Sequence, residues 1–204
     1  MATIQSVILE VEDTTAAETF YKEAFELGDV IRVRESHEPT SGFRGFVVSL
    51  VVGQPSTVNS LFESAVGAGA TATKEPSKSL WGYGAAVQAP DGTTWTFASS
   101  SKKDTGPATR AVDQVVLLLG VPDVKASRQL YVDRGLGVAR SFGGKYAELE
   151  TGDRVTLALS PRKVAAKNAG VPVDGTGSHR LVVAGDLGAF SDPEGFVWEP
   201  ADAG

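Results

Sequence analysis

The stretch SDPEGFVWEPA (residues 191–201) has a near copy in the first half of the chain, APDGTTWTFA (residues 89–98). Both combine a Pro, an acidic residue and a Gly with a Trp three positions after the Gly. Gly supplies positive φ in tight turns, so each copy predicts a turn that leads into a strand. The residue after the Trp differs, because Thr96 stands where the second copy has Glu199.

A second pair of segments repeats near the start of each half. VILEVEDTTAAETFY (residues 7–21) and VVLLLGVPDVKASRQLY (residues 115–131) each run from an apolar strand to an Asp, with a Tyr eight residues later. Two such anchors in the same order indicate an internal duplication. We therefore expect one module at residues 1–100 and a second at residues 111–204. The polar segment between them, residues 101–110, contains Gly106-Pro107 and has the composition of a linker.

Hydrophobic periodicity predicts the same order of elements in both modules. Helices are expected at residues 14–25 and 56–69 in the first module, and at 123–134 and 162–170 in the second. β-Branched and alternating runs predict strands before, between and after these helices. The order is β-α-β-β-(α)-β-β, used twice. A sheet of this kind is covered by helices on one face, and its other face can close around a second unit or a ligand.

Composition excludes several classes of function. The chain has 204 residues, a formal net charge of −6 and no long basic run, which argues against a nucleic-acid partner. Cysteine is absent, so disulfides, thiolate nucleophiles and cysteine-based metal sites are ruled out. The N-terminal segment resembles neither a signal peptide nor a membrane span, so we expect no membrane partner and a cytoplasmic location.

The Val-x-Asp segment before each first helix and the two Pro-acid-Gly-x-x-Trp segments resemble the vicinal oxygen chelate superfamily. This group includes glyoxalase I, bleomycin-resistance proteins, fosfomycin-resistance enzymes and extradiol dioxygenases. The resemblance covers nearly the whole chain. It implies an α+β fold in which two tandem βαβββ modules pair into a curled, mixed β-sheet cup with the helices outside.

The resemblance also implies where a metal would bind in this chain. Its ligand positions on the first and last strands correspond to Ser6 and Thr96 in the first module, and to Gln114 and Glu199 in the second. Ser and Thr are poor ligands for the divalent ions of this family. We therefore expect no metal. The alternative is a reduced site at Gln114 and Glu199, completed by His179, that holds Ni, Zn, Mn or Fe.

The alternation of side chains along strands suggests what lines the cup. Trp95 and Trp198 should face the helices as core residues, because Thr96 and Glu199 then face the cup. The acidic run of Glu148, Glu150 and Asp153 is expected to be a solvated patch. The candidate ligand-binding residues are Ser6, Phe46, Trp81, Tyr83, Thr96, Gln114 and Tyr146.

Three functions are consistent with these patterns. The leading prediction is metal-independent binding of a small, partly apolar molecule in the cup, as in the drug-sequestering members of the family. The alternative is a metal-dependent lyase or isomerase of the glyoxalase type, with Glu199 as the catalytic base. A structural or regulatory protein, whose cup is filled by side chains, is the third. The sequence leaves open whether the chain is an enzyme, and whether it is a monomer or a homodimer.

Overall fold

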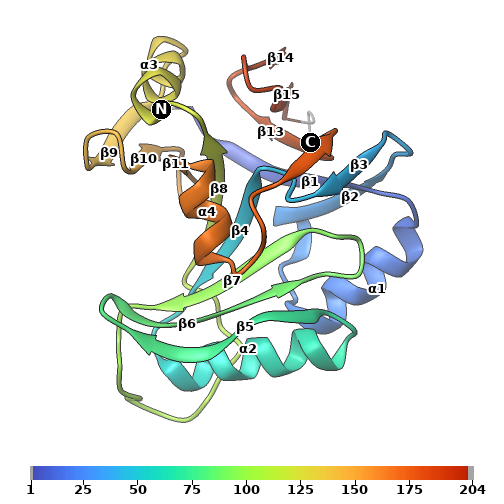
Figure 1. Cartoon of the computed structure of the whole chain (residues 1–204), viewed down its shortest axis with the longest axis vertical. Helices are drawn as coiled ribbons and strands as arrows, with labels where there is room; N and C mark the ends of the chain where they lie inside the picture. The colour runs from blue at the N-terminus through green and yellow to red at the C-terminus, as the bar shows by residue number, and fades with distance from the viewer. Residues whose placement is uncertain (1, 202–204) are drawn as a thin grey trace.

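A computed structural model describes residues 2–201 (Figure 1). The helices in this range are α1 (Thr14–Ala24), α2 (Pro55–Gly67), α3 (Val124–Asp133) and α4 (Arg162–Asn168), with a 3-10 helix at Gly28–Val30. The strands of the first half are β1 (Ile4–Val11), β2 (Ile31–Glu35), β3 (Thr40–Gly42), β4 (Phe46–Val51), β5 (Thr71–Ser79), β6 (Gly82–Gln88) and β7 (Thr94–Ser99). Those of the second half are β8 (Gln114–Val121), β9 (Gly137–Ser141), β10 (Ala147–Glu150), β11 (Thr156–Pro161), β12 (Gly175–Gly177), β13 (Leu181–Gly185), β14 (Phe190–Ser191) and β15 (Val197–Pro200). The chain is a mixed α+β protein, as the sequence predicts.

The larger sheet has eight strands in the order β5-β6-β7-β4-β8-β11-β10-β9. It consists of two βαβββ units, β4-α2-β5-β6-β7 and β8-α3-β9-β10-β11. In each unit the first strand lies parallel to the last, as β4 to β7 and β8 to β11. The two first strands, β4 and β8, pair antiparallel at the centre and join the units.

The second sheet has five strands in the order β14-β15-β13-β1-β2. Its central pair is β1 with β13, which are antiparallel and come from opposite ends of the chain. A two-stranded ribbon of β3 and β12 adds a third connection between the halves. The two halves of the sequence therefore interleave, because every sheet takes strands from both.

Three of the helices pack on the outer face of the sheets, and the fourth does not. Helices α1, α2 and α3 bury their apolar sides against the main core, in which Trp95, Phe97 and Leu117 lie. Helix α4 instead places Ala165 and Ala166 against Val47 and Leu118, which point to the opposite face of the larger sheet. The prediction that the helices lie outside thus holds for α1 to α3, whereas α4 covers part of the concave face (Figure 1).

The repeated turns are tied to the repeated tyrosines. The Tyr21 hydroxyl donates to Asp91 Oδ2 at 2.5 Å, and the Tyr131 hydroxyl donates to Asp192 Oδ2 at 2.7 Å. Asp91 follows the Pro of its turn, whereas Asp192 precedes the Pro of the second turn. In the second half the hydrogen bond to the tyrosine is therefore made by Asp192, and not by Glu194, the acidic residue of the sequence repeat. Burial and the neighbouring carboxylate raise the pKa of both tyrosines.

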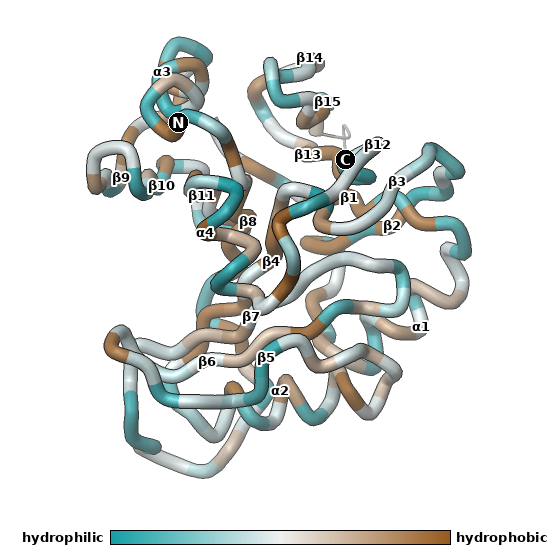
Figure 2. Tube along the Cα trace, viewed as in Figure 1, coloured by the Kyte–Doolittle hydropathy of each residue, from teal (hydrophilic) through white to brown (hydrophobic). Residues whose placement is uncertain are grey.

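Each turn also leads to a buried tryptophan, as the alternation of side chains predicts. Trp95 is 0% exposed and Trp198 is 1% exposed. Their rings lie 5.3 Å from Tyr21 and 5.5 Å from Tyr131, respectively, measured between centroids. Hydrophobic residues, brown in Figure 2, concentrate along the central strands of both sheets. The Tyr–Asp–turn–Trp combination therefore anchors one helix to one hairpin in each half.

The segment between the halves is held against the first one. Gln54 Oε1 accepts hydrogen bonds from the backbone N–H groups of Thr105 and Gly106, at 2.9 and 3.0 Å. Gln54 Nε2 donates to the carbonyl oxygen of Pro107 at 2.8 Å. The linker expected from its composition is thus fixed at the beginning of α2 by one buried amide side chain.

Truncation of the core tryptophans is expected to be costly. Trp198→Ala removes a fully buried ring and should lower the free energy of unfolding by about 3–5 kcal/mol. Trp81→Ala is the matched control, because Trp81 is 85% exposed and its loss should change stability by less than about 0.5 kcal/mol. Urea unfolding followed by circular dichroism measures both. Equal stability losses in the two variants would contradict this assignment of the core.

Candidate functional site

The concave face of the eight-stranded sheet contains a cavity of about 410 Å³. We call this cavity the cup. Its floor consists of residues that alternate with the core-facing ones along the three central strands. The floor residues are Val47, Ser49 and Val51 of β4, Thr96 and Ala98 of β7, and Val116 and Leu118 of β8. The floor is therefore made of small apolar side chains with two hydroxyl groups.

The walls of the cup come from its two hairpins and from α4. Trp81 stands at the turn of the β5–β6 hairpin, and Tyr146 lies immediately before β10. Asn168, at the end of α4, adds an amide to the lining. Thr73 Oγ1 of β5 donates to the carbonyl oxygen of Ala169 at 2.7 Å, which ties the end of α4 to the opposite edge of the sheet.

A polar cluster forms the wall at the β9–β10 side. The Tyr146 hydroxyl donates to Glu148 Oε2 at 3.2 Å, and Arg140 Nη2 lies 3.4 Å from Glu148 Oε1. Glu148 pairs with Ala158, which pairs with the floor residue Leu118, so all three share the concave face. Its side chain is only 14% exposed. Glu148 thus belongs to a hydrogen-bonded cluster, which corrects the expectation that it is solvated, whereas Asp153 is exposed as expected.

Four of the predicted ligand-binding residues line the cup together: Trp81, Tyr83, Thr96 and Tyr146. Tyr83 lies along the same wall, but its hydroxyl donates to Asn59 Oδ1 of α2 at 2.9 Å on the outer face. Phe46 is 1% exposed and packs in the helix-facing core. The structure therefore places Phe46 away from the cavity and directs the Tyr83 hydroxyl to α2 on the other face of the sheet.

The four implied metal positions are split between the two sheets. Gln114 is on β8 and donates from Nε2 to Thr156 Oγ1 at 2.6 Å, at the far end of the floor. Thr96 is on β7 of the same sheet. Ser6 and Glu199 lie in the five-stranded sheet, in one row with Ala184. Strand alternation predicts on which face of a sheet a side chain lies, but it does not predict to which sheet the strand belongs. For this reason the sequence analysis assigned all four residues to a single cup.

Glu199 has a cationic partner. Its carboxylate forms a bidentate ion pair with Arg34 of β2, with distances of 2.9 Å from Nη1 to Oε1 and 2.7 Å from Nη2 to Oε2. The pair projects from the face that carries Ile8, Val182 and Ala184, a small apolar cluster of the five-stranded sheet. A carboxylate held in this way is neutralised and oriented by the guanidinium.

The side chains in place do not fit a divalent metal. Among residues 2–201, no group of three or more His, Asp or Glu residues could hold an ion. Gln114 and Glu199, the predicted pair, belong to different sheets. His179 places Nδ1 2.5 Å from the Arg44 carbonyl oxygen and Nε2 2.8 Å from the Glu194 carbonyl oxygen, so backbone groups occupy both ring nitrogens. His37 pairs with Glu35 in an exposed loop.

Three residues that line the cup were not predicted from the sequence, although strand alternation could have identified one of them. Ser49 alternates with the apolar residues Val48 and Leu50, so strand alternation predicts its face. Lys74 lies on β5, a polar strand that the hydrophobic pattern did not reveal. Asn168 depends on α4 packing inside the cup, for which the sequence gives no signal.

No helix within residues 2–201 is both long enough and apolar enough to cross a membrane.

Solved structures with this arrangement of strands are known. Glyoxalase I from Zea mays superimposes with a TM-score of 0.59 over 97% of this chain and 91% of its own, at 17% sequence identity. A V278E variant of that protein gives a TM-score of 0.60 at 16% identity, again with 97% and 91% coverage. A putative dioxygenase from Bacillus subtilis subsp. subtilis str. 168 gives 0.56 at 10% identity, covering 95% of this chain and 71% of its own.

Sequence comparison adds no relative, because no family model and no curated protein matches the chain. The likeness is therefore one of fold, over nearly the full length of the chain. The resemblance carried by the two Pro-acid-Gly-x-x-Trp segments is confirmed at this level, and the chain has the fold of the vicinal oxygen chelate superfamily, to which glyoxalase I belongs.

Proposed function

We propose that this protein binds a small, partly apolar molecule in the cup of the eight-stranded sheet, without a metal. The observation that carries the proposal is the lining of the 410 Å³ cavity, which combines small apolar side chains with a few hydroxyl and amide groups. This volume lies in the usual range for small-molecule pockets, roughly 300–1,000 Å³. Such a lining favours a ligand that gains affinity from buried apolar surface and orientation from one or two hydrogen bonds.

The two aromatic walls suggest the shape of the ligand. Trp81 stands on one hairpin and Tyr146 on the other, with the floor residues between them. A flat aromatic or conjugated molecule could stack on either ring, which is worth about 0.5–1.5 kcal/mol beyond area burial. On this proposal Ser49 and Thr96 supply hydrogen bonds from the floor.

Charge also limits the ligand. Among the described residues, Lys74 is the single charged side chain that lines the cup, while Glu148 and Arg140 partner each other at the wall. This supports a ligand without strong charge. The alternative of a lyase or isomerase with Glu199 as base gains no support from the geometry, because Arg34 holds that carboxylate in the other sheet. A cytoplasmic location, and a monomeric or homodimeric state, stay predictions.

The titration of Tyr146 tests the wall of the cup. Burial, and then the negative charge of Glu148, raise the pKa of Tyr146 to about 12. An unfolded tyrosine ionises at about pH 10. The stabilisation that Tyr146 contributes to the folded state is therefore complete below that pH, and it is lost as the pH rises through about 12.

Glu148→Gln should lower the pKa of Tyr146, measured by phenolate absorbance against Tyr146→Phe. Glu150→Gln on the same strand is the control. An unchanged pKa in Glu148→Gln would show that the two side chains do not interact.

The binding proposal is tested by tryptophan fluorescence with a panel of small aromatic molecules. Trp95 and Trp198 are buried in the core, so quenching by a ligand in the cup should come from Trp81 and be lost in Trp81→Phe. Thr96→Phe fills the floor of the cup and should weaken binding at least about tenfold, because it removes the space for the ligand.

Glu199→Gln serves as the matched control, since it alters the other sheet and should leave binding unchanged. Circular dichroism verifies that both variants fold. Binding that survives Thr96→Phe but is lost in Glu199→Gln would place the ligand in the five-stranded sheet and overturn the proposal. So would a panel in which no molecule binds.

A further inference from the structure

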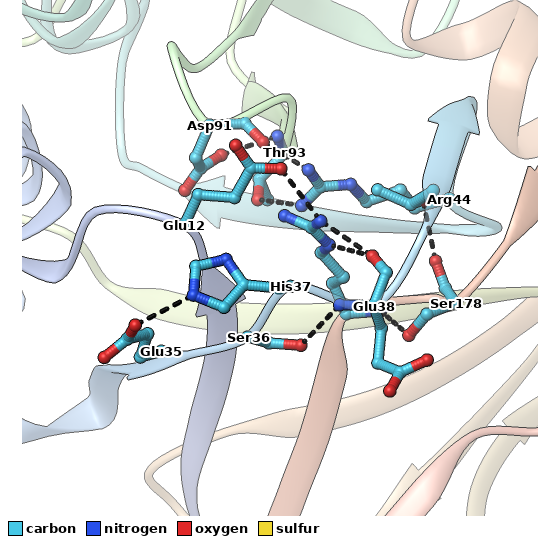
Figure 3. A network of polar contacts seen from close by, with 11 residues as sticks. Glu12, Glu35, Ser36, His37, Glu38, Arg44, Asp91, Thr93 and Ser178 are labelled. Carbon is cyan, nitrogen blue, oxygen red and sulfur yellow. Dashed lines mark hydrogen bonds and ion pairs between the residues drawn. The ribbon is translucent and has the colours of Figure 1, made fainter.

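A second cavity, of about 420 Å³, lies outside the cup where four segments of the chain meet. These are the end of β1 with the start of α1, β3 with the loop that leads to β4, the turn between β6 and β7, and the residue before β13. The turn is Pro90-Asp91-Gly92, the Pro-acid-Gly segment of the first half. Figure 3 shows the polar contacts around this junction.

Two buried arginines line this cavity. Arg44 is 8% exposed and Arg180 is 5% exposed. Buried guanidinium groups are costly unless their charge is compensated, because they lose their hydration. The contacts of these two side chains therefore indicate what the cavity can bind.

Arg180 is compensated by groups at the rim. Its Nη2 donates to Glu12 Oε1 at 3.0 Å, and its Nε and Nη2 donate to the carbonyl oxygen of Glu38 at 2.9 and 2.7 Å. Its backbone has a φ of 49°, which is uncommon for a residue other than Gly. The Ser178 hydroxyl accepts the Arg180 backbone N–H at 3.0 Å and helps to hold this conformation. A side chain that is held in a strained backbone is typical of functional sites.

Arg44 is not compensated in this way. Nη2 donates to the carbonyl oxygen of Asp91, and Nη1 lies 3.4 Å from Thr93 Oγ1. Within residues 2–201, no carboxylate lies at ion-pair distance from Arg44. The nearby Asp91 carboxylate accepts from the Tyr21 hydroxyl at 2.5 Å and from the Thr93 N–H at 2.7 Å, so it faces other donors.

The surroundings act on the Arg44 charge in both directions. Burial lowers the pKa of Arg44 and so does the positive charge of Arg180, whereas Asp91, Tyr21 and Glu12 oppose the shift. The backbone makes room for this cation, since a Cβ at Gly92 would lie only 2.9 Å from Arg44 Nη2. The cavity thus presents a guanidinium with unused N–H donors; Asp91 and Glu12 act on its charge, but neither carboxylate lies at ion-pair distance.

The rest of the lining restricts the anion. Apolar side chains from β1, α1 and the turn form one side: Val11, Ala16, Ala17, Phe20 and Pro90. Glu12, Asp13 and Asp91 also line the cavity, and their negative charges disfavour a dianion such as phosphate. A single carboxylate attached to an apolar body matches both the arginines and the apolar side.

We propose that this cavity is a binding site for a small, partly apolar monocarboxylic acid, whose carboxylate pairs with Arg44. Arg180 lies beside it as a further donor. A guanidinium matches a carboxylate through two parallel N–H···O bonds, which adds geometric selectivity to the charge interaction. This site is separate from the cup, and its occupant does not depend on what binds there.

Isothermal titration calorimetry with benzoate tests the proposal on the full chain. Wild-type protein should bind benzoate saturably, and inorganic phosphate should bind more weakly. Arg44→Gln should weaken benzoate binding about ten- to hundredfold, the loss expected for charged hydrogen bonds. Ala16→Phe, at an exposed position that lines the mouth, should weaken it as well without changing Arg44. The second variant protects the test against a folding defect in the first.

Arg140→Gln in the cup is the control and should leave benzoate affinity unchanged. The proposal would be overturned if Arg140→Gln lost benzoate binding while Arg44→Gln and Ala16→Phe kept it in full. That result would place benzoate in the cup. Absence of saturable benzoate binding to the wild type would overturn it too. Phosphate that binds more tightly than benzoate would refute the carboxylate assignment.

Discussion

The antiparallel pairing of β4 with β8 is the contact on which the rest of this structure depends. It runs from Phe46 opposite Leu119 to Val51 opposite Gln114, and it joins two βαβββ units that otherwise have no common edge. A first strand without this partner would expose a row of unpaired backbone groups and half of an apolar core. The pairing of β1 with β13 does the same for the smaller sheet. The cup follows from this constraint, since its floor contains β4, β7 and β8 from both halves.

The two halves of the chain share the anchors of the fold, but they differ in the side chains that point away from the core. Each half retains a Tyr–Asp hydrogen bond and a buried Trp, with distances and burial that closely agree. The residue after each Trp points away from the main core and differs between the halves. Thr96 now lies on the floor of an open cavity, whereas Glu199 forms an ion pair with Arg34. The carboxylate that the sequence singled out is thus a partner of a cation, in a sheet separate from the cup.

Much of the fold could be predicted from the sequence, because it depends on local physics. Apolar periodicity identified all four helices, and strand alternation identified Trp95 and Trp198 as core. The β5 strand was missed because its residues are mostly exposed and polar, as expected for a sheet edge. The position of α4 on the concave face was missed because a short Ala-rich helix has no strongly preferred side.

The site was less predictable, because it depends on contacts between distant segments. Alternation placed Thr96 and Glu199 on concave faces, but it could not tell that two sheets exist or which strands share one. Glu148 reads as part of an acidic run, yet its partners Tyr146 and Arg140 place it at the wall of the cup. Arg44 gave no signal at all, since its burial results from a junction of four segments.

The interleaving of the two halves is the central claim, and native-state hydrogen exchange tests it most directly. If both sheets need strands from both halves, the slowest amides of β1, β4, β8 and β13 should exchange through one opening reaction. Its free energy should equal the global free energy of unfolding measured with denaturant. The claim would be contradicted if the amides before and after the 101–110 segment formed two groups with clearly different opening free energies. That result would describe two independent modules.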